Sequence, residues 1–124
     1  MSGFYRWYIL IAWFLFVFVI ISFPMPEYEG EVVTLYDKVV HLFLFGIFAY
    51  LLVYNIYPNK DILKISSKLI LASCFIISVF YAGLAEYWQN FIPGRTVSEY
   101  DFFAGVIGVI LFEIIAYVSL LRKT

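Results

Sequence analysis

The chain has 124 residues, of which 65% are hydrophobic and 14% are charged, and its formal net charge is −1. This length fits one domain, residues 1–124, and leaves no room for a separate soluble catalytic module. The slight negative charge excludes a broad basic surface, so we expect no nucleic-acid partner. Apolar runs long enough to cross a bilayer indicate a membrane protein rather than a soluble core.

Four apolar runs predict transmembrane helices at about residues 7–23, 37–57, 69–91 and 99–121. The first run is interpreted as a retained helix rather than a signal peptide, because no small-x-small cleavage site follows it. Pro24 is expected to stop this helix, and Pro58 ends the second run. The connection that starts at Pro93 has turn chemistry, and Ser98 with Asp101 resembles a capping box.

The length of each run suits a membrane helix. About 17–23 residues, at roughly 1.5 Å of rise per residue, span a hydrocarbon core of about 30 Å. Helices are the only open-chain solution in lipid, because lipid offers no partners for backbone polar groups. We therefore predict an all-α integral membrane bundle of four transmembrane helices.

The basic residues predict the orientation of this bundle. One side carries Arg6, Lys60, Lys64, Lys68, Arg122 and Lys123. The other side carries Lys38 and Arg95, together with Glu27, Glu29 and Glu31. The positive-inside rule then places both termini and the lysine loop in the cytoplasm, and the acidic segment outside.

Ionisable residues of the apolar runs gather near the ends predicted to face outward. Asp37 and His41 are four residues apart and share one face of the second helix. A neighbouring carboxylate fixes the tautomer of an imidazole, and both groups can ligate a cation. Glu86 and Gln89 form a polar stripe near the end of the third helix. Because ionisable groups are costly in a membrane, this cluster is a functional-site hypothesis.

The fourth helix adds Asp101, which shares a face with Gly105 and Gly108. Glycines in a transmembrane helix usually mark a contact with another helix, so Asp101 should point into the bundle. There its carboxylate would meet Arg95, Lys38 or His41. The predicted ligand-binding set is Asp37, Lys38, His41, Glu86, Gln89, Arg95 and Asp101.

A structural reading of this cluster stays open beside the functional one. Polar groups at the interfacial ends of helices can staple a small bundle, and Asp37 and Ser98 can be simple helix starts. Cys74, the single cysteine, cannot form an internal disulfide and is expected to be a packed, inert thiol. Glu113 lies in the fourth run but not on the Asp101 face, and we leave it outside the predicted site.

The pattern of these residues resembles the VanZ-like family of small bacterial membrane proteins. The matching segments are Asp37-Lys38-Val39-Val40-His41, Glu86-Tyr87-Trp88-Gln89, Pro93-Gly94-Arg95 and Asp101. Their order and spacing fit from the second run to the fourth, whereas the first run matches by topology alone. The resemblance implies a multi-pass protein of the bacterial cytoplasmic membrane.

The founding member of that family is associated with low-level resistance to teicoplanin, a lipoglycopeptide that targets cell-wall precursors, and most members have no established activity. The family often has Asn four residues after the Asp of the fourth helix, where this chain has Gly105. An activity that depends on this amide is therefore in doubt. The lost volume would instead tighten helix packing.

Two functions are carried forward. In the first, a non-enzymatic envelope protein binds a lipid headgroup, a wall precursor or a lipoglycopeptide. Arg95 and Lys38 would then pair with phosphate or carboxylate. The apolar part of the ligand would lie against aromatic residues, namely Tyr36, Trp88, Phe91 and Tyr100.

In the second function, the chain is a membrane hydrolase or transferase that acts on an outer-leaflet lipid-linked substrate. His41 would be its general acid or base, oriented by Asp37, and Glu86 and Asp101 would form a carboxylate pair. Arg95 would stabilise the charge that develops in the reaction. A transporter ranks last, because four helices are few for a transport pathway in one chain.

A cation held by Asp37, His41, Glu86 and Asp101 is conceivable from the types of ligand. The spacing of these residues is not diagnostic of a metal site, and a lone histidine argues against zinc. Buried acids and bases more often pair with each other. We therefore predict no metal and no other cofactor, and we leave the oligomeric state open.

Overall fold

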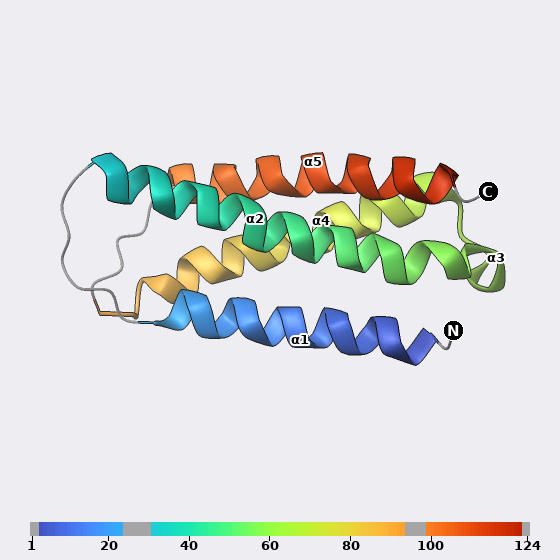
Figure 1. The fold of residues 1–124 in the computed structure, drawn as a ribbon, viewed down its shortest axis with the longest axis horizontal. Helices are drawn as coiled ribbons and strands as arrows, with labels where there is room; N and C mark the ends of the chain where they lie inside the picture. The colour runs from blue at the N-terminus through green and yellow to red at the C-terminus, as the bar shows by residue number, and fades with distance from the viewer. Residues whose placement is uncertain (1–2, 24–30, 94–98, 123–124) are drawn as a thin grey trace.

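The computed structural model describes residues 3–23, 31–93 and 99–122, and every regular element within these ranges is helical (Figure 1). Helix α1 spans Gly3–Ser22, and α2 spans Glu31–Ile56. A 3-10 turn, η1 (Tyr57–Asn59), and the short α3 (Lys60–Leu63) follow. The chain then forms α4 (Ser67–Gln89) and α5 (Glu99–Arg122). The prediction of an all-α bundle is confirmed.

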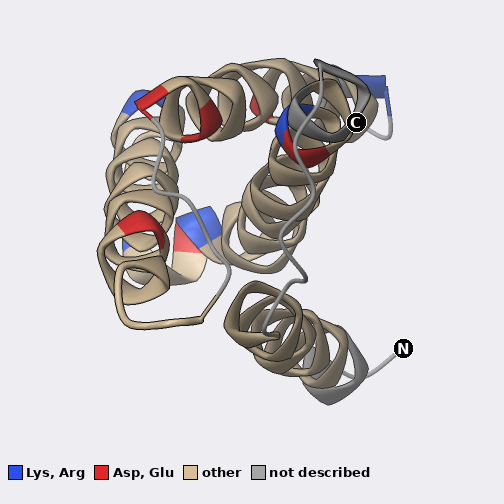
Figure 2. Cartoon of the chain, turned by 90° about the vertical axis from the view of Figure 1, so that its left-hand side faces the viewer, with Lys and Arg blue, Asp and Glu red and all other residues tan. Residues whose placement is uncertain are grey.

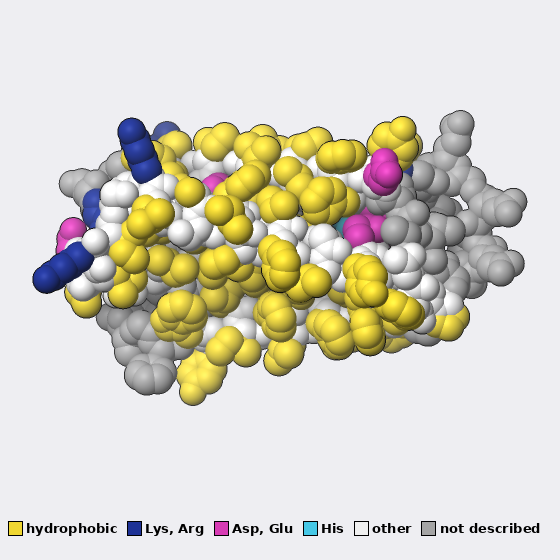
Figure 3. Space-filling view, turned by 180° about the vertical axis from the view of Figure 1, so that it is seen from behind, with side chains coloured by type: hydrophobic (Ala, Val, Ile, Leu, Met, Phe, Trp, Pro, Cys, Tyr) yellow, Lys and Arg dark blue, Asp and Glu magenta, His cyan; other side chains and the backbone are white. Residues whose placement is uncertain are grey.

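Three segments are long and apolar enough to cross a membrane, namely Leu35–Leu63, Ser67–Gln89 and Glu99–Leu120. A further apolar helical segment, Trp7–Ser22, belongs to α1 and is shorter. Large apolar side chains also cover the outside of the bundle, as Figure 3 shows for one face. An apolar exterior around helices of this length is typical of a membrane protein.

Helix α2 begins at Glu31, six residues before the start near Asp37 that the sequence predicts. No Pro or Gly interrupts residues 31–36, and an acidic residue at a helix start interacts favourably with the helix dipole. Asp37 therefore lies in the second turn of α2 and does not cap it. Pro24, the predicted stop of the first helix, and Ser98, of the predicted capping box, lie outside the described residues.

The link between α2 and α4 is a set of short turns. Lys64 has a left-handed backbone, with φ 56°, and ends α3. The Ser66 hydroxyl accepts a hydrogen bond from Leu69 N at 3.2 Å and caps the start of α4. The start of α1 and the end of α5 lie at the same end of the bundle as α3 (Figure 1). We call this the α3 end.

Helices α2 and α5 lie side by side and run in the same direction, opposite to α1 and α4 (Figure 1). Glycines allow this close approach. A Cβ added to Gly108 would overlap the carbonyl oxygen of Leu42, and one added to Gly46 would overlap the ring of Phe112. This contact brings the face of α5 that carries Asp101 against α2.

Residues 7–22 of α1 include no charged residue (Figure 2), and hydrogen bonds connect this part of the helix to the rest of the bundle. Trp13 Nε1 donates to the carbonyl of Leu44 at 2.9 Å, and the Tyr81 hydroxyl donates to the carbonyl of Phe14 at 3.0 Å. Each bond adds a side-chain donor to a helix carbonyl, so α1 is positioned by polar contacts as well as by apolar packing.

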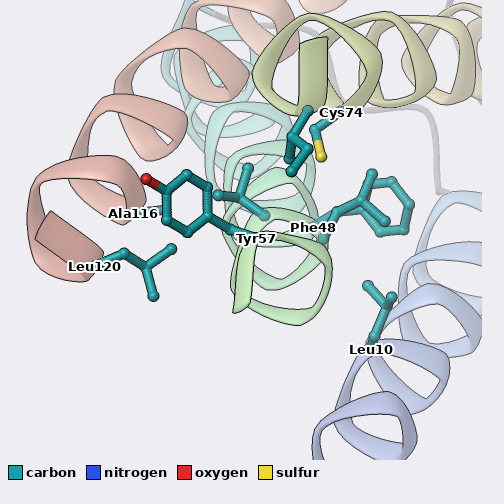
Figure 4. Close-up of a cluster of buried hydrophobic side chains, with 9 residues drawn as sticks. Leu10, Phe48, Tyr57, Cys74, Ala116 and Leu120 are labelled. Carbon is teal, nitrogen blue, oxygen red and sulfur yellow. The ribbon is translucent and has the colours of Figure 1, made fainter. Parts of the chain in front are cut away.

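The core has two apolar clusters. The cluster toward the α3 end includes Leu10, Phe48, Tyr57, Cys74, Ala116 and Leu120 (Figure 4). The second cluster includes Val17, Ile21, Phe45, Ala82 and Val109. Cys74 is fully buried, which agrees with the packed thiol expected from the sequence. The polar groups described next lie beyond the second cluster.

Candidate functional site

Buried polar side chains from three helices meet at the end of the bundle away from α3. Carboxylates and the histidine are visible there among apolar side chains, whereas basic side chains gather at the opposite end (Figure 3). The residues are Asp37 and His41 of α2, Glu86 of α4 and Asp101 of α5. We call these four residues the acid–imidazole cluster.

His41 is the centre of this cluster and is only 2% exposed. Its Nδ1 lies 2.8 Å from the backbone carbonyl oxygen of Asp37, one turn earlier in α2. Because a carbonyl oxygen can only accept, Nδ1 carries the hydrogen and donates it. The Asp37 carboxylate lies on the same side, with Oδ1 3.9 Å from Nδ1. The ring orientation is therefore fixed by the helix that carries it.

The other ring nitrogen of His41 faces α4. Nε2 lies 3.3 Å from Oε1 of Glu86, and Glu86 itself is 7% exposed. The inner face of α4 runs through Ala82 and Ala85 to Glu86, and these small side chains let α4 approach α2. An imidazole and a carboxylate from different helices thus face each other in a nearly dry setting.

Asp101 completes the cluster from the first turn of α5 and is 3% exposed. One carboxylate oxygen each of Asp37 and Asp101 and one ring nitrogen of His41 all lie within 4.8 Å of one another. Asp101 reaches this position because Gly105, one turn later, packs against Phe45 of α2. A Cβ on Gly105 would lie 3.1 Å from the Phe45 ring, so α5 lies close to α2 here.

Gln89 lies next to the cluster but is directed toward α1. It is 2% exposed, and its Nε2 donates to the carbonyl of Ile21 at 3.3 Å. A cavity of about 400 Å³ opens beside it. Its polar lining comes from Asp37, His41 and Gln89, and its apolar lining includes Phe16, Ile20, Ile21, Val40 and Leu44.

Three further residues named from the sequence are Tyr36, Lys38 and Arg95, and they have different positions. Tyr36 lines the cavity, as the binding hypothesis expects of an aromatic residue. Lys38 is half-buried, and its Nζ lies 5.8 Å from the centroid of the Tyr100 ring. Arg95 lies outside the described residues. Of the predicted site residues, the structure brings together the four of the acid–imidazole cluster. Gln89 and Tyr36 line the neighbouring cavity.

Three aromatic residues expected around the pocket lie elsewhere. Trp88, Phe91 and Tyr100 are exposed, and none of them lines the cavity. Trp88 Nε1 instead donates to the Ser22 hydroxyl at 2.8 Å, which makes it a tie between α4 and α1. Phe91 and Tyr100 are strongly exposed, where aromatic residues suit a membrane interface.

The sequence reasoning missed the contribution of α1. Phe16, Ile20 and Ile21 form much of the apolar wall, and the carbonyl of Ile21 holds Gln89. The first apolar run is uniformly hydrophobic, so no residue in it marks the face that lines the cavity. The orientation of α1 is set by tertiary hydrogen bonds, which the sequence does not show. Trp13 of α1 donates to α2, and Tyr81 and Trp88 of α4 donate to α1.

Glu113 lies on α5 away from the cluster. It lines a separate cavity of about 300 Å³ between α4 and α5, together with Leu71, Phe75, Ile110, Ile114 and Tyr117. Its Oε1 is buried and has no hydrogen-bond partner in the structure. It lies twelve positions after Asp101, or about 18 Å along the helix axis. Glu113 is therefore not part of the acid–imidazole cluster.

Fold and site together define a small helical membrane protein with a buried acid–imidazole cluster beside an amphipathic cavity. No family model, no curated protein and no solved structure matches the chain. The class therefore rests on the helices and the cluster themselves. The VanZ-like resemblance stays a prediction.

Proposed function

We propose that the chain is a multi-pass protein of the bacterial cytoplasmic membrane that binds the polar headgroup of an amphiphile at its outer face. The amphiphile is a lipid, a lipid-linked wall precursor or a lipoglycopeptide, and binding contributes to tolerance of teicoplanin-type antibiotics. The cavity next to the acid–imidazole cluster carries this proposal. The VanZ-like pattern adds the link to the antibiotic.

The lining of the cavity suits an amphiphile. Asp37, His41 and Gln89 offer hydrogen-bond donors and acceptors on one side, and apolar side chains of α1 and α2 cover the rest. Its volume of about 400 Å³ lies in the lower part of the usual range for ligand pockets, about 300–1,000 Å³. This size accommodates a headgroup and the adjoining part of a chain, not a whole lipid.

The orientation is supported by the basic residues. Lys60, Lys64 and Lys68 surround the α3 end, and the acid–imidazole cluster lies at the other end. Under the positive-inside rule the α3 end faces the cytoplasm. The cluster and the cavity then face the outer leaflet, where wall precursors are used and where lipoglycopeptides act.

Alanine variants of the cluster in a host that lacks the protein test this function. Susceptibility to teicoplanin and the amount of protein in the membrane are measured together for His41→Ala, Glu86→Ala and Asp101→Ala. Glu113→Ala is the matched control, because it also removes an intramembrane carboxylate but lies outside the cavity. We expect lost tolerance at normal protein level for the cluster and unchanged tolerance for the control.

Three outcomes would count against binding at this site. Cluster variants that are present in the membrane and keep full tolerance would show that the cluster is dispensable. Cluster variants that disappear from the membrane, while Glu113→Ala persists, would favour a purely structural network. Purified protein that turns over a lipid-linked substrate would replace the binding function by the enzymatic one.

The enzymatic alternative is favoured by one observation. His41 has Nδ1 held by a backbone carbonyl at 2.8 Å, and its Nε2 faces the Glu86 carboxylate at 3.3 Å. An imidazole oriented in this way beside a carboxylate is a suitable general acid or base. A hydrolase or transferase would lose turnover in His41→Gln but keep ligand binding, which separates the two functions.

A further inference from the structure

We propose that the acid–imidazole cluster binds a divalent transition-metal ion through His41 Nε2 and the carboxylates of Glu86, Asp37 and Asp101. From the sequence we predict no metal, because the spacing along the chain is not diagnostic, a lone histidine argues against zinc, and buried acids and bases more often pair with each other. The support for a metal site comes from the positions of these side chains in the folded protein. This inference rests on the proposed function in one respect, since the ion would lie where the headgroup binds.

The first supporting feature is the hydrogen bond of His41. Nδ1 donates to the backbone carbonyl of Asp37 at 2.8 Å, which leaves Nε2 as the nitrogen with a lone pair in the neutral ring. Metal-binding histidines nearly always donate their other ring N–H to a carbonyl or a carboxylate. The ring of His41 is thus held in the tautomer and the orientation that a metal ligand requires.

The second feature is what Nε2 faces. It lies 3.3 Å from Oε1 of Glu86 but forms no hydrogen bond, and His41 is 2% exposed. A nitrogen lone pair and a carboxylate oxygen repel each other unless a proton or a metal cation lies between them. With metal–ligand bonds of about 2.0–2.2 Å, two neighbouring ligands are about 3.0–3.5 Å apart. The observed separation fits two ligands of one ion.

The third feature is that carboxylates from two helices, α2 and α5, lie close to His41. Asp37 and Asp101 offer oxygens that lie, with a ring nitrogen of His41, within 4.8 Å of one another. Because Asp37 Oδ1 lies 3.9 Å from Nδ1, the Asp37 carboxylate must rotate toward Nε2 to join the same ion. Closing separations of up to 4.8 Å to the ligand spacing of a metal site requires side-chain shifts of roughly 1–2 Å. Such shifts are available to Asp37, which is half-buried, through rotation about its side-chain bonds.

The composition of the cluster favours an oxygen-preferring ion. It has three carboxylates and one imidazole, and carboxylates suit Mn²⁺ whereas imidazoles suit zinc, copper and nickel. A divalent cation also offsets the cost of placing several carboxylates together in a low dielectric. We therefore expect a Mn²⁺-type site rather than a zinc site.

A metal ion also fits the ligand of the proposed function. Wall precursors and most lipids carry phosphate, and an anionic headgroup is repelled by carboxylates. Divalent ions are often held by one or two carboxylates together with the phosphate of a substrate. An ion at His41 and Glu86 would bridge the cluster to a phosphate in the adjoining cavity, which Asp37 and His41 also line.

Electron paramagnetic resonance of the purified protein with Mn²⁺ tests the site. The protein is prepared in detergent micelles without a histidine tag. Bound Mn²⁺ is counted from the loss of the signal of the free ion, and pulsed measurements detect coupling to ¹⁴N. Because His41 is the one histidine of the chain, imidazole coupling identifies it as a ligand. We expect one ion per chain with imidazole nitrogen coupling.

Near-isosteric variants complete the test. We expect Asp101→Asn and Glu86→Gln to weaken Mn²⁺ binding by at least about 10-fold, as loss of supporting groups does in metal sites. Glu113→Gln, a matched change outside the cluster, should leave the affinity unchanged. Circular dichroism confirms that each variant is folded. Absence of stoichiometric Mn²⁺, absence of nitrogen coupling in the folded wild-type protein, or equal affinity in the folded variants would overturn the proposal.

The same preparation separates this inference from the proposed function. Binding of a fluorescent phosphate-bearing lipid is measured with Mn²⁺ and with a chelator. Lipid that binds equally in both conditions, without Mn²⁺ uptake, supports the proposed function and overturns the metal site. Mn²⁺ uptake with nitrogen coupling, without lipid binding, supports the metal site and counts against the proposed function. Lipid binding that requires Mn²⁺ supports both.

Discussion

The contact between α2 and α5 should be sensitive to a single methyl group at Gly108. A Cβ on this residue would lie 2.8 Å from the carbonyl carbon of Leu42 and 3.0 Å from its Cα, and it would overlap the carbonyl oxygen. These atoms belong to the backbone of α2, so no side-chain rotation relieves the overlap. Gly83→Ala is the matched control, because its Cβ would meet the Phe102 ring at an ordinary 3.6 Å.

The expected cost follows from these distances. The overlap with the Leu42 carbonyl oxygen is the most severe of these contacts, so α2 and α5 would have to separate by more than about 1 Å near Gly108. Overpacking of this kind costs about 1–3 kcal/mol. Replacing Gly by Ala inside a helix contributes about 0.5–1 kcal/mol in favour of the helix, and this gain applies equally to Gly83→Ala. The difference between the two variants should therefore be about 1–3 kcal/mol.

Unfolding by increasing mole fractions of SDS in detergent micelles, followed by circular dichroism, measures this difference. Gly108→Ala should unfold at a lower SDS fraction than the wild-type protein. Gly83→Ala should unfold at the same fraction or a higher one. If Gly108→Ala and Gly83→Ala are equally stable, α2 and α5 do not approach as closely as described, and the position of Asp101 against α2 loses its structural basis.

Three further predictions use the same preparation. Gln89→Leu removes the donor to the Ile21 carbonyl and should lower the free energy of unfolding by about 1 kcal/mol, and unchanged stability would show that this bond does not hold α1. Gly105→Asn should cost about 1–3 kcal/mol, because even its Cβ would lie 3.1 Å from the buried Phe45 ring, and a variant of wild-type stability would contradict this packing. Cys74 is fully buried and should react with a maleimide only after unfolding, whereas rapid reaction in the folded protein would place it at the surface.

Most of the fold could be predicted from the sequence, because each apolar run is long enough to cross a bilayer and lipid leaves a helix as the open-chain solution. The start of α2 could not be predicted, since residues 31–36 contain acidic and apolar residues that fit either a loop or a helix. The turn at Tyr57 was marked by Pro58, and the structure places η1 there.

The site was partly predictable for a similar reason. The spacing of Asp37 and His41 on one helix follows from helical periodicity, and the structure has them one turn apart. The approach of Glu86 to His41 depends on how α4 packs against α2, and this packing cannot be predicted from the spacing of residues along the chain. The apolar wall from α1 depends on tertiary hydrogen bonds, such as that from Trp13 to the Leu44 carbonyl.

A double-mutant cycle between His41 and Glu86 tests most directly whether different helices deliver their polar groups to one buried site. The free energy of unfolding is measured for His41→Ala, for Glu86→Ala and for the double variant, and a second cycle pairs His41 with Glu113. Side chains in contact should couple by about 0.5–3 kcal/mol, whereas distant ones add within about 0.3–0.5 kcal/mol. We predict coupling for His41 with Glu86 and additivity for His41 with Glu113. Additivity in both cycles would contradict the shared site.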